Sequence, residues 1–195
     1  MIGLVDYGGG NITSVSNALD RLGVNYIKGS TPSDFIDVDK IIFPGVGEAK
    51  TAMDAIEERF LRPYLKSLEI PFLGICIGLQ ILFDYTDERS TDCIGIINSK
   101  LKKFDSKDLK VPHIGWNSVS FTKGSPLFQG IEDGAYFYFV NSYYASEVAE
   151  TIATTEYGVN FSSAVNKDNY YGVQFHTEKS GELGEKLLKN FIELC

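Results

Sequence analysis

One cysteine in this chain stands in a setting that favours nucleophilic chemistry. The apolar run from Pro71 to Ile75 leads to Cys76, and Gly74 and Gly78 stand two residues to either side of it. A strand, a sharp turn and a helix in this order form a nucleophile elbow, whose crowded backbone accepts little more than hydrogen at the glycine positions. A sulfur at a helix N-terminus is favoured as a thiolate, because the helix dipole and free N–H groups stabilise negative charge. The segment predicts a nucleophilic cysteine, with a buried structural cysteine as the alternative.

A thiol nucleophile needs a base within hydrogen-bond reach and a third group that orients the base. The chain has two histidines, and His176 is followed two residues later by Glu178 at the expected end of a strand. Alternation along a strand would point both side chains to one face, so that Glu178 orients the imidazole and stabilises its cation. A lone histidine in a strand is more often structural, and we expect His113, which has no acidic neighbour to orient it, to be structural or to lie at an interface.

Acyl transfer also needs donors for the oxyanion, and backbone N–H groups are the usual ones. The N–H of Ile77, directly after the nucleophile, is the first expected donor. An apolar strand at 41–43 breaks into Pro44-Gly45-Val46-Gly47, where glycines allow backbone amides to face a ligand. An ordinary tight turn would explain this second segment equally well if it stood alone.

The composition limits the class of protein. The 195 residues fit one domain over 1–195, and no apolar run approaches the roughly 20 residues needed to span a bilayer. A formal net charge of −8 without an extended basic cluster argues against nucleic-acid binding. Three cysteines give neither a paired framework nor a metal-binding spacing, so we expect no metal and a reducing cytoplasmic setting.

The elements that must hold these residues alternate along the first half of the chain. Strand signals near 2–6, 24–27, 40–43 and 71–75 alternate with helical patterns near 12–22, 49–67 and 78–85. This alternation predicts an α/β fold, a mostly parallel central sheet with helices on both faces. From 93 to 174 short β-rich runs predict an antiparallel extension, and 182–194 reads as an amphipathic helix that covers the sheet.

Several motifs together resemble the class I (triad) glutamine amidotransferases, which have a flavodoxin-like sheet. Within that family the chain is similar to glutaminase subunits of imidazole glycerol phosphate synthase. The match keeps the family order over nearly the full length and runs through Val5-Asp6-Tyr7-Gly8, Pro44-Gly45-Val46-Gly47, Gly74-Ile75-Cys76-Ile77-Gly78-Leu79-Gln80, Pro112-His113-Ile114-Gly115-Trp116-Asn117, Tyr138-Phe139-Val140-Asn141-Ser142-Tyr143 and Gly172-Val173-Gln174-Phe175-His176. The chain departs from the family pattern at Asn141, where histidine is usual, and at Thr177, where proline is usual.

The resemblance implies roles that the residues alone do not. It implies Cys76, His176 and Glu178 as a triad that hydrolyses glutamine to glutamate and ammonia through a thioester. It implies no cofactor, and as partner a cyclase subunit with a (β/α)8 barrel, joined in a heterodimer that makes imidazole glycerol phosphate and an aminoimidazole carboxamide nucleotide in histidine biosynthesis.

Further residues follow from the same resemblance, position by position. The second oxyanion donor falls at Val46 or Gly47. Substrate contacts fall at Gly47, Gln80, Glu88, Ser142 and Tyr143. The partner interface falls at Asn11, Trp116, Tyr138 and Lys179. A solvent-exposed acidic side chain is the alternative for Glu88, and a place in the core is the alternative for Trp116.

Other functions compete with this one. A paralogous glutaminase would supply ammonia to another synthase, such as a nucleotide-sugar enzyme, and the departures at Asn141 and Thr177 leave that open. A non-catalytic regulatory homologue would be expected to lack a triad residue. A cysteine peptidase accounts for the elbow, but less well for the Pro-Gly-Val-Gly and His-x-Glu segments.

Overall fold

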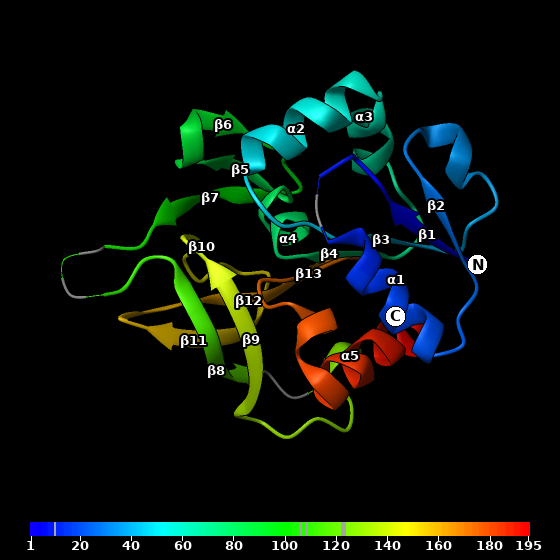
Figure 1. Cartoon of the computed structure of the whole chain (residues 1–195). Helices are drawn as coiled ribbons and strands as arrows, with labels where there is room; N and C mark the ends of the chain where they lie inside the picture. The colour runs from blue at the N-terminus through cyan, green and yellow to red at the C-terminus, as the bar shows by residue number, and fades with distance from the viewer. Residues whose placement is uncertain (10, 106, 108, 122–123) are drawn as a thin grey trace.

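The computed structural model describes residues 1–9, 11–105, 107, 109–121 and 124–195 (Figure 1). The helices are α1 (Ile12–Arg21), α2 (Ala49–Glu58), α3 (Leu61–Lys66), α4 (Ile77–Gln80) and α5 (Gly181–Leu194), with 3-10 turns η1 (Pro32–Phe35), η2 (Glu88–Ser90), η3 (Pro126–Phe128) and η4 (Thr177–Lys179). The strands are β1 (Ile2–Val5), β2 (Tyr26–Gly29), β3 (Lys40–Phe43), β4 (Phe72–Ile75), β5 (Phe83–Thr86), β6 (Thr91–Asp92), β7 (Ile97–Lys103), β8 (His113–Phe121), β9 (Ala135–Asn141), β10 (Tyr143–Ala145), β11 (Thr151–Tyr157), β12 (Val159–Lys167) and β13 (Tyr170–Val173).

The larger sheet combines a parallel and an antiparallel half. Across the described residues its order is β2-β1-β3-β4-β13-β12-β11-β8-β9. The strands from β2 to β13 are parallel, and those from β13 to β9 are antiparallel. A second sheet in the order β10-β7-β5-β6 lies beside α2 in Figure 1. The predicted parallel sheet with an antiparallel extension is confirmed, although the large sheet as a whole is mixed.

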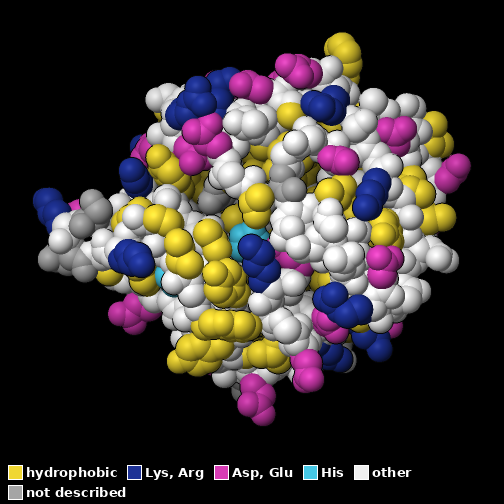
Figure 2. Space-filling view, in the orientation of Figure 1, with side chains coloured by type: hydrophobic (Ala, Val, Ile, Leu, Met, Phe, Trp, Pro, Cys, Tyr) yellow, Lys and Arg dark blue, Asp and Glu magenta, His cyan; other side chains and the backbone are white. Residues whose placement is uncertain are grey.

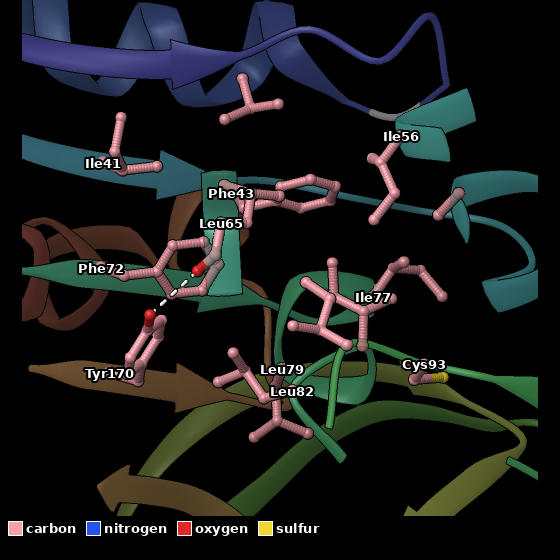
Figure 3. Packing of buried hydrophobic residues seen from close by; sticks show 14 of the residues in the cluster. Ile41, Phe43, Ile56, Leu65, Phe72, Ile77, Leu79, Leu82, Cys93 and Tyr170 are labelled. Atoms are coloured by element: carbon pink, nitrogen blue, oxygen red, sulfur yellow. Dashed lines mark hydrogen bonds between the residues drawn. The ribbon is translucent and has the colours of Figure 1, made fainter. Parts of the chain in front are cut away.

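Helices cover both faces of the parallel half, because its strands are apolar on both sides. On β3, Ile41 belongs to the cluster under α2 and α3, and its neighbour Ile42 belongs to the cluster under α1 and α5. Figure 3 shows the first of these clusters, where the hydroxyl of Tyr170 donates to the carbonyl of Leu65 at 2.9 Å. In the second cluster Leu187 of α5 is fully buried, as the amphipathic pattern predicts.

Two of the expected helices are wrong in extent. The expected helix at 49–67 is divided into α2 and α3 at Phe60, which takes a left-handed conformation with φ 56°. Pro63 explains the break, because in a continuous helix its ring would clash with the carbonyl of Arg59 and it has no N–H to donate. The expected helix at 78–85 ends at Gln80, and the chain then enters β5, which pairs with β7.

No helix in the described part of the chain is long and apolar enough to cross a membrane.

Candidate active site

Cys76 sits on a strained turn between β4 and α4. Its backbone has φ 55° and ψ −101°, and α4 begins at the next residue, as predicted. A Cβ atom on Gly74 would lie 2.1 Å from the carbonyl oxygen of Gly78, and one on Gly78 would lie 2.1 Å from that of Phe43. Both glycines are therefore required by backbone contacts rather than by side chains. Because α4 is one turn long, its dipole acts on the sulfur only locally.

His176 and Glu178 form a buried pair. His176 Nδ1 lies 2.8 Å from Glu178 Oε1, and each side chain is 1% exposed. The expectation that strand alternation holds this pair is wrong. β13 ends at Val173, His176 follows in extended conformation, and Glu178 lies in η4, so the 3-10 turn brings the carboxylate back to the ring.

Two adjacent parallel strands bring the cysteine and the histidine together. β4 and β13 pair in a register that places Ile75 beside Val173, and the N–H of Cys76 donates to the carbonyl of Val173 at 2.8 Å. The N–H of His176 donates to the carbonyl of Tyr138 on β9 at 2.8 Å. Both reactive residues thus follow the carboxyl ends of neighbouring strands, where ligands bind in open α/β sheets.

The electrostatics of the site favour an imidazolium on His176. Burial by itself lowers the pKa of His176. The charge of Cys76, the hydrogen bonds that the ring donates to Cys76 and Glu178, and the charge of Glu178 outweigh that effect and raise the pKa from 6.5 to about 10. A cation held between a sulfur and a carboxylate is the arrangement that nucleophilic thiols use.

A cavity of about 380 Å³ opens beside the sulfur. Such a volume suits a small-molecule ligand. It is lined by Val46, Gly47, Cys76, Ile77, Gln80, Glu88, Pro112, Val140, Asn141, Ser142, Tyr143, His176 and Lys179. The structure therefore brings together every residue expected in the oxyanion hole and the substrate pocket, with Glu178 behind His176.

Glu88 is half-buried at the wall of this cavity. It is therefore not the solvent-exposed acidic side chain that the sequence left as the alternative. Its Oε2 accepts a hydrogen bond from the N–H of Ala49 at 2.6 Å. Burial raises the pKa of the Glu88 carboxyl, and the bond from Ala49 acts in the opposite direction. A carboxylate at the wall of a cavity is suited to bind a cationic group of a ligand.

Comparison with protein families decides where the chain belongs. The model for "Glutamine amidotransferase class-I" matches residues 3–194. The chain belongs to this family.

Relatives within the class-I glutamine amidotransferases are close and cover the full length. Imidazole glycerol phosphate synthase subunit HisH of Escherichia coli K12 is 46% identical over 192 residues, covering 98% of each chain. HisH of Bacteroides fragilis (strain ATCC 25285) is 45% identical and covers 99% of each chain. HisH 1 of Vibrio vulnificus YJ016 is 44% identical, covering 98% of this chain and 97% of the relative. The resemblance deduced from the motifs is confirmed.

Solved structures support the fold alone, because their sequence identity is low. A structure titled glutamine amidotransferase has a TM-score of 0.76 at 16% identity and covers 99% of this chain and 97% of that one. A chain in the structure of PurLQS from Thermotoga maritima has a TM-score of 0.73 at 18% identity and covers 98% of this chain and 96% of that one. The expected fold of the class-I amidotransferases is confirmed.

Of the residues expected at the partner interface of this amidotransferase, some lie at the surface and one contacts the triad. Trp116 is 55% exposed, which excludes its alternative in the core, and its ring packs edge-on against Tyr138 at 5.9 Å. Lys179 Nζ lies 5.9 Å from the centre of the Tyr138 ring. Asn11 instead donates to Glu178 Oε1 at 3.4 Å. Figure 2 shows hydrophobic side chains gathered over β8 and β9.

Sequence reasoning about this amidotransferase missed two buried amides at the site. Asn141 lines the cavity at 5% exposure and donates to the carbonyl of Tyr143 at 3.0 Å. Gln174 lies 3.6 Å from the Cys76 sulfur. The sequence marks Asn141 only as a departure from the family and Gln174 only as part of a motif. The position of Gln174, directly after a strand paired with the strand of the nucleophile, was the available signal.

The second histidine has a structural environment, as expected. His113 is 4% exposed, and its ring stacks on Tyr157 at 3.9 Å and on Phe139 at 5.0 Å. Burial lowers its pKa from 6.5 to about 4. This ring is therefore neutral at physiological pH. Within the described residues no group of three or more His, Cys, Asp or Glu is placed to hold a metal ion.

Proposed function

We propose that this chain is a glutaminase that hydrolyses the side-chain amide of glutamine to glutamate and ammonia. The observation that carries the proposal is the buried pair of His176 and Glu178, 2.8 Å apart, at a cavity that also holds Cys76 on a strained elbow. The family and the three functional groups of a covalent acyl transfer agree.

The first half of the reaction forms a thioester. The Cys76 sulfur attacks the amide carbon, and the carbonyl electrons move onto oxygen to give a tetrahedral oxyanion. His176, protonated in the resting site, gives its proton to the leaving nitrogen as the C–N bond breaks and ammonia departs. Glu178 holds the ring by its Nδ1 and stabilises the cation before the proton is transferred.

The second half hydrolyses the thioester. His176 takes a proton from water as the water attacks, and the C–S bond breaks to release glutamate and the thiolate. Both oxyanions need donors about 3 Å away. Ile77 is the first residue of α4, and N–H groups in a first helical turn have no intrahelical acceptor, so its N–H supports this role. Val46 and Gly47 line the same cavity and supply the second donor.

The substrate binds across the cavity from the sulfur. Glu88 receives the α-ammonium group of glutamine, and Gly47, Gln80, Ser142 and Tyr143 complete the pocket. The half-buried carboxylate of Glu88 and the position of all five residues on the wall support this assignment. The chain acts as one domain in a reducing cytoplasm, where Cys76 stays reduced and forms no disulfide.

The ammonia is delivered to a cyclase subunit. At neutral pH free ammonia is mostly ammonium, a poor nucleophile, so a direct transfer is advantageous. The relatives at 44–46% identity are named as subunits of imidazole glycerol phosphate synthase. These names support a partner subunit, and the family resemblance implies that it is a cyclase with a (β/α)8 barrel that makes imidazole glycerol phosphate and an aminoimidazole carboxamide nucleotide. We propose that it docks on the face of Trp116, Tyr138 and Lys179, with Asn11 as a further contact.

The deciding experiment measures glutamate release from glutamine by the native chain and by Cys76→Ser, alone and with the cyclase and its nucleotide ligand. We expect turnover that requires Cys76 and rises sharply with the cyclase. Cys93→Ser is the matched control, because Cys93 is 1% exposed away from the cavity lining and burial raises its thiol pKa to about 12. This variant should retain the native turnover.

Two results would change the proposal. Turnover that needs Cys76 but does not change when the cyclase is added would indicate a paralogous glutaminase with another ammonia acceptor. Equal turnover by the native chain and Cys76→Ser in every condition would exclude the covalent mechanism.

A further inference from the structure

Gln174 is a buried side chain next to the nucleophile to which the reaction above gives no task. It directly follows β13, and its backbone N–H donates to the carbonyl of Ser163 on β12 at 2.9 Å. The paired strand β4 ends at Ile75, and Cys76 follows it beside Gln174. The side chain of Gln174 is fully buried. A buried amide must satisfy its polar atoms within the protein, so its partners determine its orientation.

Three contacts fix which end of the amide faces the sulfur. The carbonyl of Tyr143 can only accept, so Gln80 presents its Nε2 there, at 3.4 Å. The same Nε2 lies 3.1 Å from the Gln174 oxygen, which accepts from it. The Nε2 of Gln174 is therefore directed at the Cys76 sulfur, 3.6 Å away. A reversed Gln174 amide would place two donors against each other and an oxygen against the sulfur.

We propose that Gln174 is a positioning residue that donates a hydrogen bond to the Cys76 thiolate and holds it for attack, with Gln80 fixing the orientation of the donor. The surroundings of the sulfur explain why the thiolate needs such a donor. The carbonyl oxygen of Val140 lies 3.9 Å from the sulfur and can accept only from a neutral thiol. Once the proton is lost, that oxygen repels the thiolate, while a buried donor to a charged sulfur gains strength. The proposal rests on the function proposed above, because it assigns the thiolate as the attacking group.

The test removes the donor while keeping the volume. Gln174→Met lacks the N–H, and Gln174→Asn retracts the amide from the sulfur. Iodoacetamide alkylates Cys76, and the modified peptide is followed by mass spectrometry across pH. We expect both variants to slow alkylation at neutral pH by roughly 10- to 100-fold, because this is the effect of losing one hydrogen bond to a charged group. We also expect the midpoint of the pH profile to move upward. The kcat for glutamine in the cyclase complex should fall by a similar factor.

The matched control is Asn190→Leu. Asn190 lies on α5, is 2% exposed and donates hydrogen bonds to the carbonyls of Leu127 and Gln129. The control therefore also removes a buried amide that makes two hydrogen bonds, but Asn190 does not line the cavity. It should destabilise the fold and leave the alkylation rate unchanged. Slowed alkylation in the Asn190 variant, or native alkylation in Gln174→Met and Gln174→Asn, would overturn the proposal and reduce Gln174 to a structural amide.

A measurement on the native protein keeps the proposal testable if the variants do not fold. Blocking Cys76 as a mixed disulfide with methyl methanethiosulfonate removes the thiolate, and the side-chain amide protons of Gln174 should then shift in the NMR spectrum. Unshifted protons would contradict the proposal. If alkylation of Cys76 depends on Gln174 but the protein shows no glutaminase turnover, Gln174 is a thiolate donor and the proposed function is rejected. If the protein turns over glutamine and neither turnover nor alkylation depends on Gln174, the proposed function stands and the role of Gln174 is rejected.

Discussion

At the scale of single residues, the two histidines of this chain show how the environment sets a protonation state. His176 is buried between a sulfur and a carboxylate, and its pKa rises to about 10. His113 is buried among aromatic rings, and its pKa falls to about 4. Burial acts in the same direction on both rings, so the difference comes from the two partners of His176.

The shifted pKa of His113 predicts a loss of stability in mild acid. Because its pKa in the folded state lies below the unfolded value of 6.5, the neutral ring stabilises the fold above pH 6.5, and this contribution is lost as the pH falls toward 4. Between pH 6.5 and about 5 the loss is about 2 kcal/mol. Urea unfolding of the native chain and of His113→Phe should show the steeper decline in the native chain.

His176 does not interfere in that range. Its folded pKa lies above 6.5, so its contribution is complete below pH 6.5 and is lost only as the pH rises through about 10. Parallel declines in the native chain and His113→Phe would contradict the assignment of His113 as a buried neutral ring. NMR titration of the two imidazoles supplies an independent check, since at pH 7 one ring should be charged and the other neutral.

At the scale of elements, the site depends on how β3, β4, α4 and β13 are packed together. The nucleophile turn fits only because Gly78 allows α4 to approach the carbonyl of Phe43 on β3. Close backbone packing of this kind cannot relax by a side-chain rotation.

The elbow predicts that two glycine substitutions have unequal costs. In Gly78→Ala the new Cβ would lie 2.1 Å from a backbone oxygen, whereas in Gly172→Ala it would lie 3.1 Å from the Leu79 side chain. We expect Gly78→Ala to lower the free energy of unfolding by about 3 kcal/mol or more and Gly172→Ala by about 1 kcal/mol. Urea denaturation measures both changes. Equal losses of unfolding free energy in the two variants would contradict the tight contact between Gly78 and the carbonyl of Phe43.

At the scale of the whole molecule, the β8–β9 face carries the exposed aromatic surface near the cavity. Ile114, Trp116 and Tyr136 are each more than half exposed there. Exposed aromatic residues beside charged ones are typical of protein interfaces. The same strand β9 holds His176 through the carbonyl of Tyr138, so the face and the site share one element.

Association with the cyclase should depend on Trp116. Trp116→Ala is expected to weaken binding by about 30-fold, as a central aromatic residue of an interface does, with a stability change within about 1 kcal/mol. Phe60→Ala is the control, because Phe60 is 76% exposed at the break between α2 and α3 and outside the β8–β9 face. Calorimetric titration measures both affinities. An equal loss of affinity in the two variants would place the interface elsewhere.

The sequence by itself determined the alternating first half of the fold, the family and the residues around the cavity. It could do so because the decisive signals are local. The contact that requires glycine at 74 comes from Gly78, four residues along, Gly47 of the Pro-Gly-x-Gly turn has φ 104°, and the apolar residues 41–43 are buried on both faces. Even the break before Pro63 was readable from a local rule, although the expected helix passed over it.

The tertiary structure decided what depends on contacts between distant segments. The contact of Asn11 with Glu178 and the amide of Gln174 that Gln80 directs at Cys76 join residues far apart in the chain. The end of α4 was decided in the same way, because β5 pairs with β7 instead of continuing the helix. The physical reason is that periodicity and propensity describe neighbours along the chain, whereas orientation inside a packed site is set by which polar partners the fold brings within hydrogen-bond distance.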